Sequence, residues 1–496
     1  MNRPPYVLAL DAGTSSSRAL LFDAAGQAIA TAQREFTQYF PREGWVEHDP
    51  EEIWATQLDA MREVIARVNP TDIAALGITN QRETTVVWER STGKPVYPAI
   101  VWQDKRTAHV CAEIDQHHGP LFRQRTGLLP DPYFSGTKLA WILRQHPDHP
   151  ARAQKGELLF GTIDTWLIWK LTGGTVHATD ASNASRTLMF DIHRNKWDPE
   201  LLDILGIPGG MLPAVHDSSG VIGHTRPEFT GHAIPIAGIA GDQQAALFGQ
   251  LCHTPGMVKN TYGTGCFCMM NTGSQAHEST HRLLTTIAWR LNGQTTYALE
   301  GGVFVAGALI QWLRDQLGLV KTAPEIEHLA HTVADNGGIT FIPALSGLGA
   351  PYWRPEATGA ILGITRGTQP GHIARAALEA IALSSAELIE AMQRDSHFNI
   401  PLLKVDGGAS RNDLLMQMQA DFLDTPVVRP QQTETTALGA AFLAGLATGV
   451  WGNVAELQGL QREVRVFEPQ SPEVSRRMPV RLQWNQNMKR MLQDVS

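Results

Sequence analysis

Two short stretches rich in glycine and hydroxyl side chains have the composition of phosphate-binding loops. The first, Asp11-Ala-Gly-Thr-Ser-Ser-Ser17, offers backbone N–H groups and hydroxyls to a phosphate and one carboxylate to a hydrated Mg²⁺. The second, Tyr262-Gly-Thr-Gly265, repeats this arrangement far along the chain. One such loop alone is equally well explained as a hairpin turn without a ligand. The pair, one in each half of the chain, favours a grip on an oligophosphate from two sides.

A third stretch, Asp406-Gly-Gly-Ala-Ser-Arg-Asn412, places glycines where a flat ring could approach the backbone. An adenosine site is the functional interpretation, and a plain turn between a strand and a helix is the structural alternative. Ser410 and Asp413 fit a capping box, which predicts that a helix begins at this turn.

The segments around the two loops indicate strands. VLAL, ALLFD and AIATAQREF surround the first loop and predict a strand, a tight return and two further strands. A Walker loop runs from strand to helix and ends in Gly-Lys-Ser/Thr, so the Walker interpretation fails. GMVKNTYGTGCFCMMNTG repeats the strand, loop and strand pattern in the second half. The sequence therefore predicts two similar halves that each open with a β-hairpin.

Other elements alternate between helix and strand. Apolar residues from Trp54 to Val68 recur at helical spacing, a buried strand follows over 73–79, and PIAGIAGD predicts a strand that ends at Asp242. The last clear helix is expected over 435–449, where small residues permit close packing. This alternation predicts an α/β fold of two duplicated domains with mixed central sheets, over residues 1–250 and 251–496, and an active-site cleft between them.

Composition narrows the class of protein. A chain of 496 residues with 43% hydrophobic and 18% charged residues is typical of a globular protein with two domains. The net charge of -8, without a block of basic residues, argues against nucleic acid or an anionic membrane as the main partner. The first apolar run is broken by Asp11, so a cytoplasmic location is expected. Cys111, Cys252, Cys266 and Cys268 lack metal-ligand spacing and are expected to be reduced, buried thiols.

The three motifs, in this order, resemble those of the FGGY carbohydrate kinase family, which shares the actin and hexokinase ATPase fold. PYFSGTKLAWIL from Pro132 and GLGAPYWRPEATGAILGITRG from Gly347 are also similar to that family's signatures. The resemblance covers essentially the whole chain. It implies ribonuclease H-like domains, ATP and Mg²⁺ as cosubstrate and cofactor, and a homo-oligomer, either a dimer or a tetramer. Hinge closure is expected as well, because a two-domain kinase that closes on its acceptor keeps water from taking the acceptor position.

The resemblance also implies an acceptor pocket that would bracket vicinal hydroxyls with polar groups and cover a short carbon chain with aromatic rings. Its expected members are Arg82, Glu83, Trp102, Tyr133, Asp242, Gln243 and Phe267. Taken singly, a Trp after a strand is more often core, and an Arg-Glu neighbour pair is usually a solvated ion pair. As a set they point to a small triol, with glycerol as the expected phosphoryl acceptor.

For the nucleotide, the resemblance places Thr14, Ser15, Ser16, Thr264 and Gly307 at the phosphates, Arg18 near the nucleotide, and Gln311, Gly408 and Asn412 toward the adenosine. Asp11 and Asp242 are the expected Mg²⁺ ligands. Asp242 is also the expected base for the attacking hydroxyl.

Two alternatives remain open. A related kinase that acts on a pentulose or gluconate would keep every ATP motif and differ only in the acceptor pocket. An actin- or chaperone-like ATP switch would hydrolyse ATP without a small acceptor, and it would not need the pocket residues. Release of ADP that depends on the acceptor distinguishes a kinase from a switch.

Overall fold

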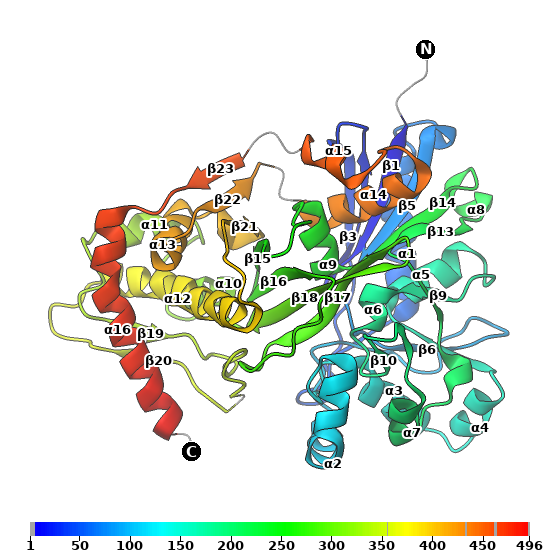
Figure 1. Cartoon of the computed structure of the whole chain (residues 1–496), viewed down its shortest axis with the longest axis horizontal. Helices are drawn as coiled ribbons and strands as arrows, with labels where there is room; N and C mark the ends of the chain where they lie inside the picture. The colour runs from blue at the N-terminus through cyan, green and yellow to red at the C-terminus, as the bar shows by residue number, and fades with distance from the viewer. Residues whose placement is uncertain (1–4, 355, 432–433, 461–463, 495–496) are drawn as a thin grey trace.

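The computed structural model of the chain describes residues 5–354, 356–431, 434–460 and 464–494, and within them thirteen strands form one continuous mixed sheet (Figure 1). In order across the sheet the strands are β23 (Val464–Phe467), β22 (Val427–Pro430), β21 (Leu403–Asp406), β15 (Val258–Tyr262), β16 (Cys266–Gly273), β18 (Gln294–Val303), β17 (Leu284–Leu291), β13 (Ser219–His224), β14 (Pro235–Gly241), β5 (Ile73–Asn80), β1 (Tyr6–Ala12), β2 (Ser16–Phe22) and β3 (Ala28–Glu35).

Short strands pair outside this sheet. They are β4 (Glu47–His48) with β7 (Ala99–Ile100), β6 (Val86–Glu89) with β8 (Leu158–Gly161), β9 (Ala178–Asp180) with β12 (Ala214–His216), β10 (Phe190–Asp191) with β11 (Lys196–Trp197), and β19 (Thr340–Ile342) with β20 (Ala360–Leu362).

The large sheet contains the same five-stranded pattern twice. In the first half β1 pairs antiparallel with β2 and parallel with β5, β2 pairs antiparallel with β3, and β5 pairs parallel with β14. In the second half β15 takes the place of β1, with β16, β18, β21 and β22 in the corresponding positions and directions. This repetition confirms the predicted duplicated α/β domains and both predicted hairpins.

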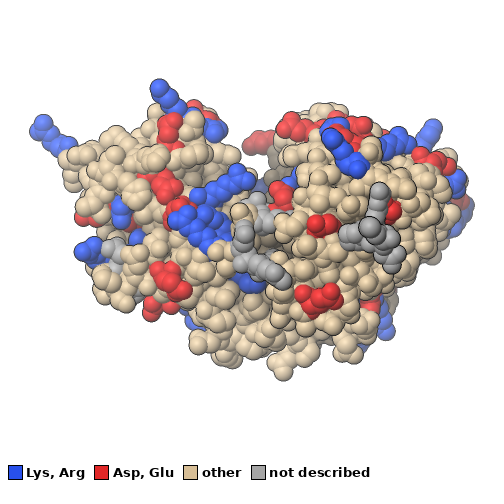
Figure 2. All heavy atoms as spheres, turned by 90° about the horizontal axis from the view of Figure 1, so that it is seen from above, with Lys and Arg blue, Asp and Glu red and all other residues tan. Residues whose placement is uncertain are grey.

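The two patterns are joined, a feature that the sequence did not reveal. β13 pairs antiparallel with β14 of the first half, and its residue Ser219 pairs with Leu291 of β17 in the second half. The two mixed sheets are therefore continuous across the molecule. Seen from above, the two lobes face each other across a hollow (Figure 2).

Helices cover the sheet. The α-helices are α1 (Pro50–Ile65), α2 (Ala108–Thr126), α3 (Ser135–Leu143), α4 (His149–Gln154), α5 (Ile163–Leu171), α6 (Ala181–Ala184), α7 (Pro199–Leu205), α8 (Pro227–Thr230), α9 (Asp242–Gly249), α10 (Gly307–Asp315), α11 (Glu325–Ala330), α12 (Pro370–Ser396), α13 (Asp413–Leu423), α14 (Thr435–Thr448), α15 (Val454–Gln458) and α16 (Ser471–Asp494). The 3₁₀ turns are η1 (Pro70–Asp72), η2 (Gly209–Met211) and η3 (Gly408–Arg411). The helix predicted from the spacing of apolar residues between Trp54 and Val68 corresponds to α1. It begins after a capping residue, because the Asp49 side chain accepts a hydrogen bond from the Glu51 N–H.

Helix α14 lies against the sheet of the first half, although it comes late in the chain (Figure 1). Small residues make this contact possible. A Cβ at Gly77 of β5 would lie 2.2 Å from the Ala440 carbonyl oxygen, and one at Gly439 would lie 1.9 Å from the Ala245 carbonyl oxygen of α9. The close packing expected from this segment is confirmed.

Two predictions about helices are wrong. Ser410 does not cap α13, because its hydroxyl donates to the Gly407 carbonyl within η3, and Asn412 caps the helix by accepting from the Leu415 N–H. The segment 435–449 is not the last clear helix, since α15 and the long α16 follow it. In Figure 1, α16 runs along the outer side of the second half.

The four cysteines are free and buried, as expected. Among the described residues, no helix is long and apolar enough to cross a membrane.

Candidate active site

Three candidate residues meet where parallel strands end. In the sheet register Ala12 of β1 lies beside Asn80 of β5, and Asn80 lies beside Gly241 of β14. Asp11, Arg82 and Asp242 stand at or just beyond these three strand ends. Ligands of open α/β sheets bind outside the carboxyl ends of their strands, so the fold places these side chains where a ligand is expected.

Asp242 is the first residue of α9, and its side chain is 31% exposed. Its Oδ1 atom accepts a hydrogen bond from the Gln243 N–H at 2.7 Å and lies 3.2 Å from Nε of Arg82. Burial raises the pKa of Asp242 to about 6, against the opposing effect of Arg82. The carboxyl is therefore mostly ionised at neutral pH, and its pKa lies close enough to that pH for it to accept a proton, which suits a general base.

Behind Asp242, four buried charges form a closed ring. Arg82 donates to both carboxylate oxygens of Glu300, at 2.6 and 2.8 Å, and lies 3.7 Å from Glu83. Arg186 donates to Glu83 at 2.7 Å and to Glu300 at 3.1 Å. Burial alone would raise the pKa of Glu300, yet Arg186 and Arg82 outweigh it and lower this pKa to about 2. Acidic and basic side chains alternate around the ring.

Aromatic residues lie beside this ring of charges. The Trp102 ring packs edge-on against two other rings, with its centroid 5.5 Å from that of Tyr133 and 6.3 Å from that of Phe267. All three side chains are partly exposed. The Tyr133 hydroxyl accepts from Arg82 at 3.3 Å. Trp102 Nε1 donates to the Thr14 hydroxyl at 3.0 Å, which ties the pocket to the first glycine loop. The predicted acceptor residues from both halves therefore come together.

Gln243 contacts a buried lysine. Lys259 of β15 donates from Nζ to Oε1 of Gln243 and, at 2.9 Å, to the Thr261 hydroxyl. Burial lowers the pKa of Lys259, while Asp406 and Asp242 raise it. This cation lies between the acceptor pocket and the adenosine motif.

The first glycine loop is held by charges from both halves. Arg18 forms an ion pair with Asp11 and another, at 2.6 Å, with Glu434 of the second half. Gly13 closes the turn by donating from its N–H to the Ser16 carbonyl at 2.9 Å, and Ser15 is exposed. The loop therefore presents backbone and hydroxyl groups at its surface.

The other nucleotide motifs also converge. The Gly307 N–H donates to the Gly263 carbonyl at 3.0 Å, and the Ala308 N–H donates to the Thr264 carbonyl at 3.0 Å. A Cβ at Gly307 would lie 4.0 Å from the Ala409 Cβ, so the second glycine loop, the start of α10 and the Gly-Gly turn adjoin.

The remaining adenosine candidates border this cluster. A Cβ at Gly408 would meet no atom within 4 Å, Asn412 caps α13, and Gln311 is exposed about one turn along α10 from Gly307.

Oxygen ligands suited to Mg²⁺ are present, but in the part of the chain that the structure describes they form no cage of side chains. Among the described residues, no group of three or more His, Cys, Asp or Glu side chains could hold a metal ion. Mg²⁺ usually keeps several waters and binds one or two carboxylates together with substrate phosphates. Asp11 and Asp242, beside two phosphate-type loops, fit that kind of site.

Sequence reasoning missed three charged residues at the site: Arg186, Lys259 and Glu300. A signal was present for two of them, because Lys259 in VKNTY and Glu300 in YALEGG interrupt strands that are otherwise buried. A charge in a buried strand needs a partner. Neither strand indicates which partner it has.

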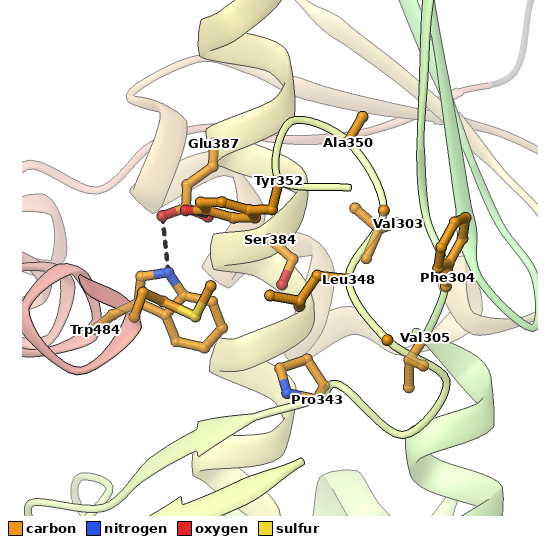
Figure 3. A pocket seen from close by; sticks show the side chains of 13 residues that line it. Val303, Phe304, Val305, Pro343, Leu348, Ala350, Tyr352, Ser384, Glu387 and Trp484 are labelled. Carbon is orange, nitrogen blue, oxygen red and sulfur yellow. Dashed lines mark hydrogen bonds between the residues drawn. The ribbon is translucent and has the colours of Figure 1, made fainter. Parts of the chain in front are cut away.

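A separate small cavity lies in the second half (Figure 3). Trp484 of α16 and Tyr352 both donate to Glu387 of α12, at 2.9 and 3.0 Å. None of the residues that line this cavity is a candidate site residue. The chemistry described above is therefore located elsewhere.

Comparison with known proteins agrees with this geometry. The model of the N-terminal domain of the FGGY family of carbohydrate kinases matches residues 6–249, and the model of its C-terminal domain matches residues 258–448. A glycerol kinase of Dechloromonas aromatica is 58% identical over 98% of this chain and 97% of its own length.

Solved structures agree as well. The glycerol kinase of Plasmodium falciparum with ADP superposes with a TM-score of 0.92 at 34% identity, over 99% of this chain and 98% of that one. A gluconate kinase of Lactobacillus acidophilus shares the fold, with a TM-score of 0.90 at 22% identity over 99% of both chains. Because the two domain models match in order over most of its length, the chain belongs to the FGGY family of carbohydrate kinases.

Proposed function

We propose that this enzyme phosphorylates glycerol with ATP and releases sn-glycerol 3-phosphate and ADP. The observation that carries the proposal is a cluster in which Arg82 contacts both Asp242 and Tyr133, and the Trp102 ring packs edge-on against the Tyr133 and Phe267 rings. Its polar groups can bind vicinal hydroxyls while the rings cover a short carbon chain. The relatives named glycerol kinase, at 55 to 59% identity over nearly the whole chain, support the same substrate.

In the proposed mechanism, Asp242 accepts the proton of the terminal hydroxyl as that oxygen forms a bond to the γ-phosphorus of ATP. The bond between this phosphorus and the β,γ-bridging oxygen breaks, and ADP leaves. The transition state of phosphoryl transfer is loose, so alignment and charge neutralisation supply most of the catalysis.

Each motif has a role in that alignment. Thr14, Ser15, Ser16, Thr264 and Gly307 bind the phosphates in this proposal. Gln311, Gly408 and Asn412 bind the adenosine, and Arg18 holds the first loop beside it. Mg²⁺, held by Asp11 and Asp242, would neutralise charge on the phosphate oxygens.

Further parts of the proposal concern the whole chain. Two domains, over residues 1–250 and 251–496, would close around both substrates, which keeps water from taking the acceptor position. The hollow between the lobes is the expected cleft (Figure 2). We also propose a cytoplasmic homo-oligomer, a dimer or a tetramer. The free thiols agree with a reducing compartment.

The alternative acceptor is a pentulose or gluconate. The gluconate and xylulose kinases among the structural neighbours are 20 to 26% identical to this chain. A panel of glycerol, other polyols, pentuloses and gluconate, assayed for formation of the phosphorylated product with ATP, tests the choice. Glycerol should give the highest kcat/KM, and a higher value for a pentulose, for gluconate or for another polyol would overturn the proposed substrate.

A further inference from the structure

Glu300 is charged and buried, yet none of the proposed roles in chemistry uses it. It lies on β18 of the second half, and its side chain is 2% exposed. Its carboxylate accepts from Arg82 and Arg186, both of which come from the first half. Burying a charged group is costly unless its partners satisfy it fully, so such a group calls for an explanation.

The donors of Arg82 indicate what Glu300 does. Two of the five N–H groups of Arg82 go to Glu300, and a third goes to Gln244 at 3.2 Å. The remaining two face Asp242 at 3.2 Å and the Tyr133 hydroxyl at 3.3 Å, both of which line the pocket. A bidentate pair fixes the plane of a guanidinium. Glu300 therefore determines which donors of Arg82 point toward the acceptor.

Arg186 orients Glu83 in the same way that Glu300 orients Arg82, through buried hydrogen bonds. Its Nε donates to Oε1 of Glu83 at 2.7 Å, and its Nη2 donates to Glu300 at 3.1 Å. The Arg186 guanidinium also lies 5.5 Å from the Tyr133 ring centroid and 5.1 Å from that of Phe134. Arg186 thus fixes one carboxylate oxygen of Glu83 in the ring of charges.

The main chain leaves room for this arrangement. A Cβ at Gly241 would lie 2.6 Å from Cγ of Arg82, so the Arg82 stem crosses the backbone directly before Asp242. Glu83 has a positive φ of 63°, which places consecutive side chains Arg82 and Glu83 in the same ring. Local backbone and long-range charges together specify the geometry.

We propose that Glu300 and Arg186 are positioning residues that set the hydroxyl specificity of the acceptor pocket without touching the acceptor. Glu300 orients Arg82, and Arg186 orients Glu83. Glu300 also makes recognition depend on both halves of the molecule, because it reaches the pocket from β18. This inference rests on the proposed function.

The test compares Glu300→Gln with Asp421→Asn, a matched control. Asp421 is likewise buried in the second half and accepts from Arg477 at 3.1 Å, but it belongs to no candidate site. For each variant, kcat and KM are measured for glycerol and for ATP. Discrimination between glycerol and propane-1,2-diol is measured as well, together with the Tm.

Glu300→Gln is expected to lower kcat/KM for glycerol about 10²-fold, since misplacement by about 1 Å has that effect. KM for ATP should stay within about twofold, because the ring does not contact the nucleotide motifs. The preference for glycerol over the diol should shrink. Asp421→Asn should lower the Tm, and it should leave both kcat/KM for glycerol and the preference for glycerol over the diol unchanged.

A folded Glu300→Gln enzyme with unchanged glycerol kinetics and unchanged preference would overturn the inference. An equal loss of preference in Asp421→Asn would do the same. If Glu300→Gln does not fold, Arg186→Lys decides in its place. Lys keeps the charge but cannot bridge Glu83 and Glu300 through a planar fork, so the same glycerol-specific loss is expected. A wild-type enzyme that does not phosphorylate glycerol refutes the proposed function itself, which separates the two failures.

Discussion

The ionisation of Asp242 should set the acid limb of the pH–rate profile, in which activity falls as the pH is lowered. Burial raises the pKa of its carboxyl to about 6. With that pKa, about 0.9 of the enzyme carries the ionised base at pH 7 and about 0.1 does so at pH 5. The kcat/KM for glycerol is therefore expected to fall about tenfold between pH 7 and pH 5.

Replacing the carboxyl tests the same point. Asp242→Asn keeps the shape of the side chain and removes the base, and general-base catalysis is worth about 10² to 10⁴ in rate. ATP affinity should be nearly unchanged, because the nucleotide motifs and Asp11, the other proposed Mg²⁺ ligand, stay in place. The assay follows ADP release at saturating MgATP and varied glycerol from pH 5 to pH 8. The residual activity of Asp242→Asn should no longer show the limb near pH 6.

Asp164 provides the control for that experiment. Burial raises its pKa to about 7, although hydrogen bonds from Thr162 and Thr179 oppose the rise. Asp164→Asn should leave the acid limb in place, since the residue is no part of the pocket. A loss of less than about tenfold in Asp242→Asn would show that Asp242 is not the base. An acid limb near pH 6 that persists in Asp242→Asn would also contradict the assignment. So would an acid limb that disappears in Asp164→Asn.

Four further outcomes are expected. Gly408→Ala should raise KM for ATP without lowering the Tm, because a Cβ there meets no protein atom, and the equally open Gly210→Ala serves as its control. Gly439→Ala should destabilise the fold by about 1–3 kcal/mol in thermal melts, since its Cβ would lie 1.9 Å from the Ala245 carbonyl oxygen. The raised pKa of Asp164 means that its ionised form opposes folding, so stability from this group is lost as pH rises from about 4 to about 7. The Tm of Asp164→Asn relative to wild type should therefore increase across that window, and a flat difference would contradict the shift. Propane-1,2-diol should be phosphorylated up to about 10⁴-fold less efficiently than glycerol, because the missing hydroxyl leaves buried groups unpaired, and comparable kcat/KM values would refute the pocket assignment.

Local patterns allowed the sequence to predict the repeated part of the fold. The hairpins around the two glycine loops are encoded in short apolar runs with small residues between them, and both are present. The position of Asp242 at a strand end follows from the same kind of pattern. These features depend on neighbours in the chain, so periodicity and turn chemistry reveal them.

Features that depend on distant residues escaped prediction. The ring joins Arg82 to Glu300 across much of the sequence, and no local pattern specifies that pairing. Helix α16 was missed because it is largely polar and contains Pro479, although Trp484 and Met488 are buried against the second half. Ser410 was predicted to cap α13 because the capping-box motif fits. Its hydroxyl instead donates a hydrogen bond to the Gly407 carbonyl at the preceding 3₁₀ turn.

The most direct test of the account is the stoichiometry of ATP use with and without glycerol. Purified enzyme, MgATP and glycerol should give ADP and sn-glycerol 3-phosphate in equal amounts, both quantified by mass spectrometry. Without glycerol, ADP release should fall to a small fraction of that rate. Equal ADP release in both conditions, or ADP without glycerol phosphate, would show an ATP switch or another acceptor and contradict the account.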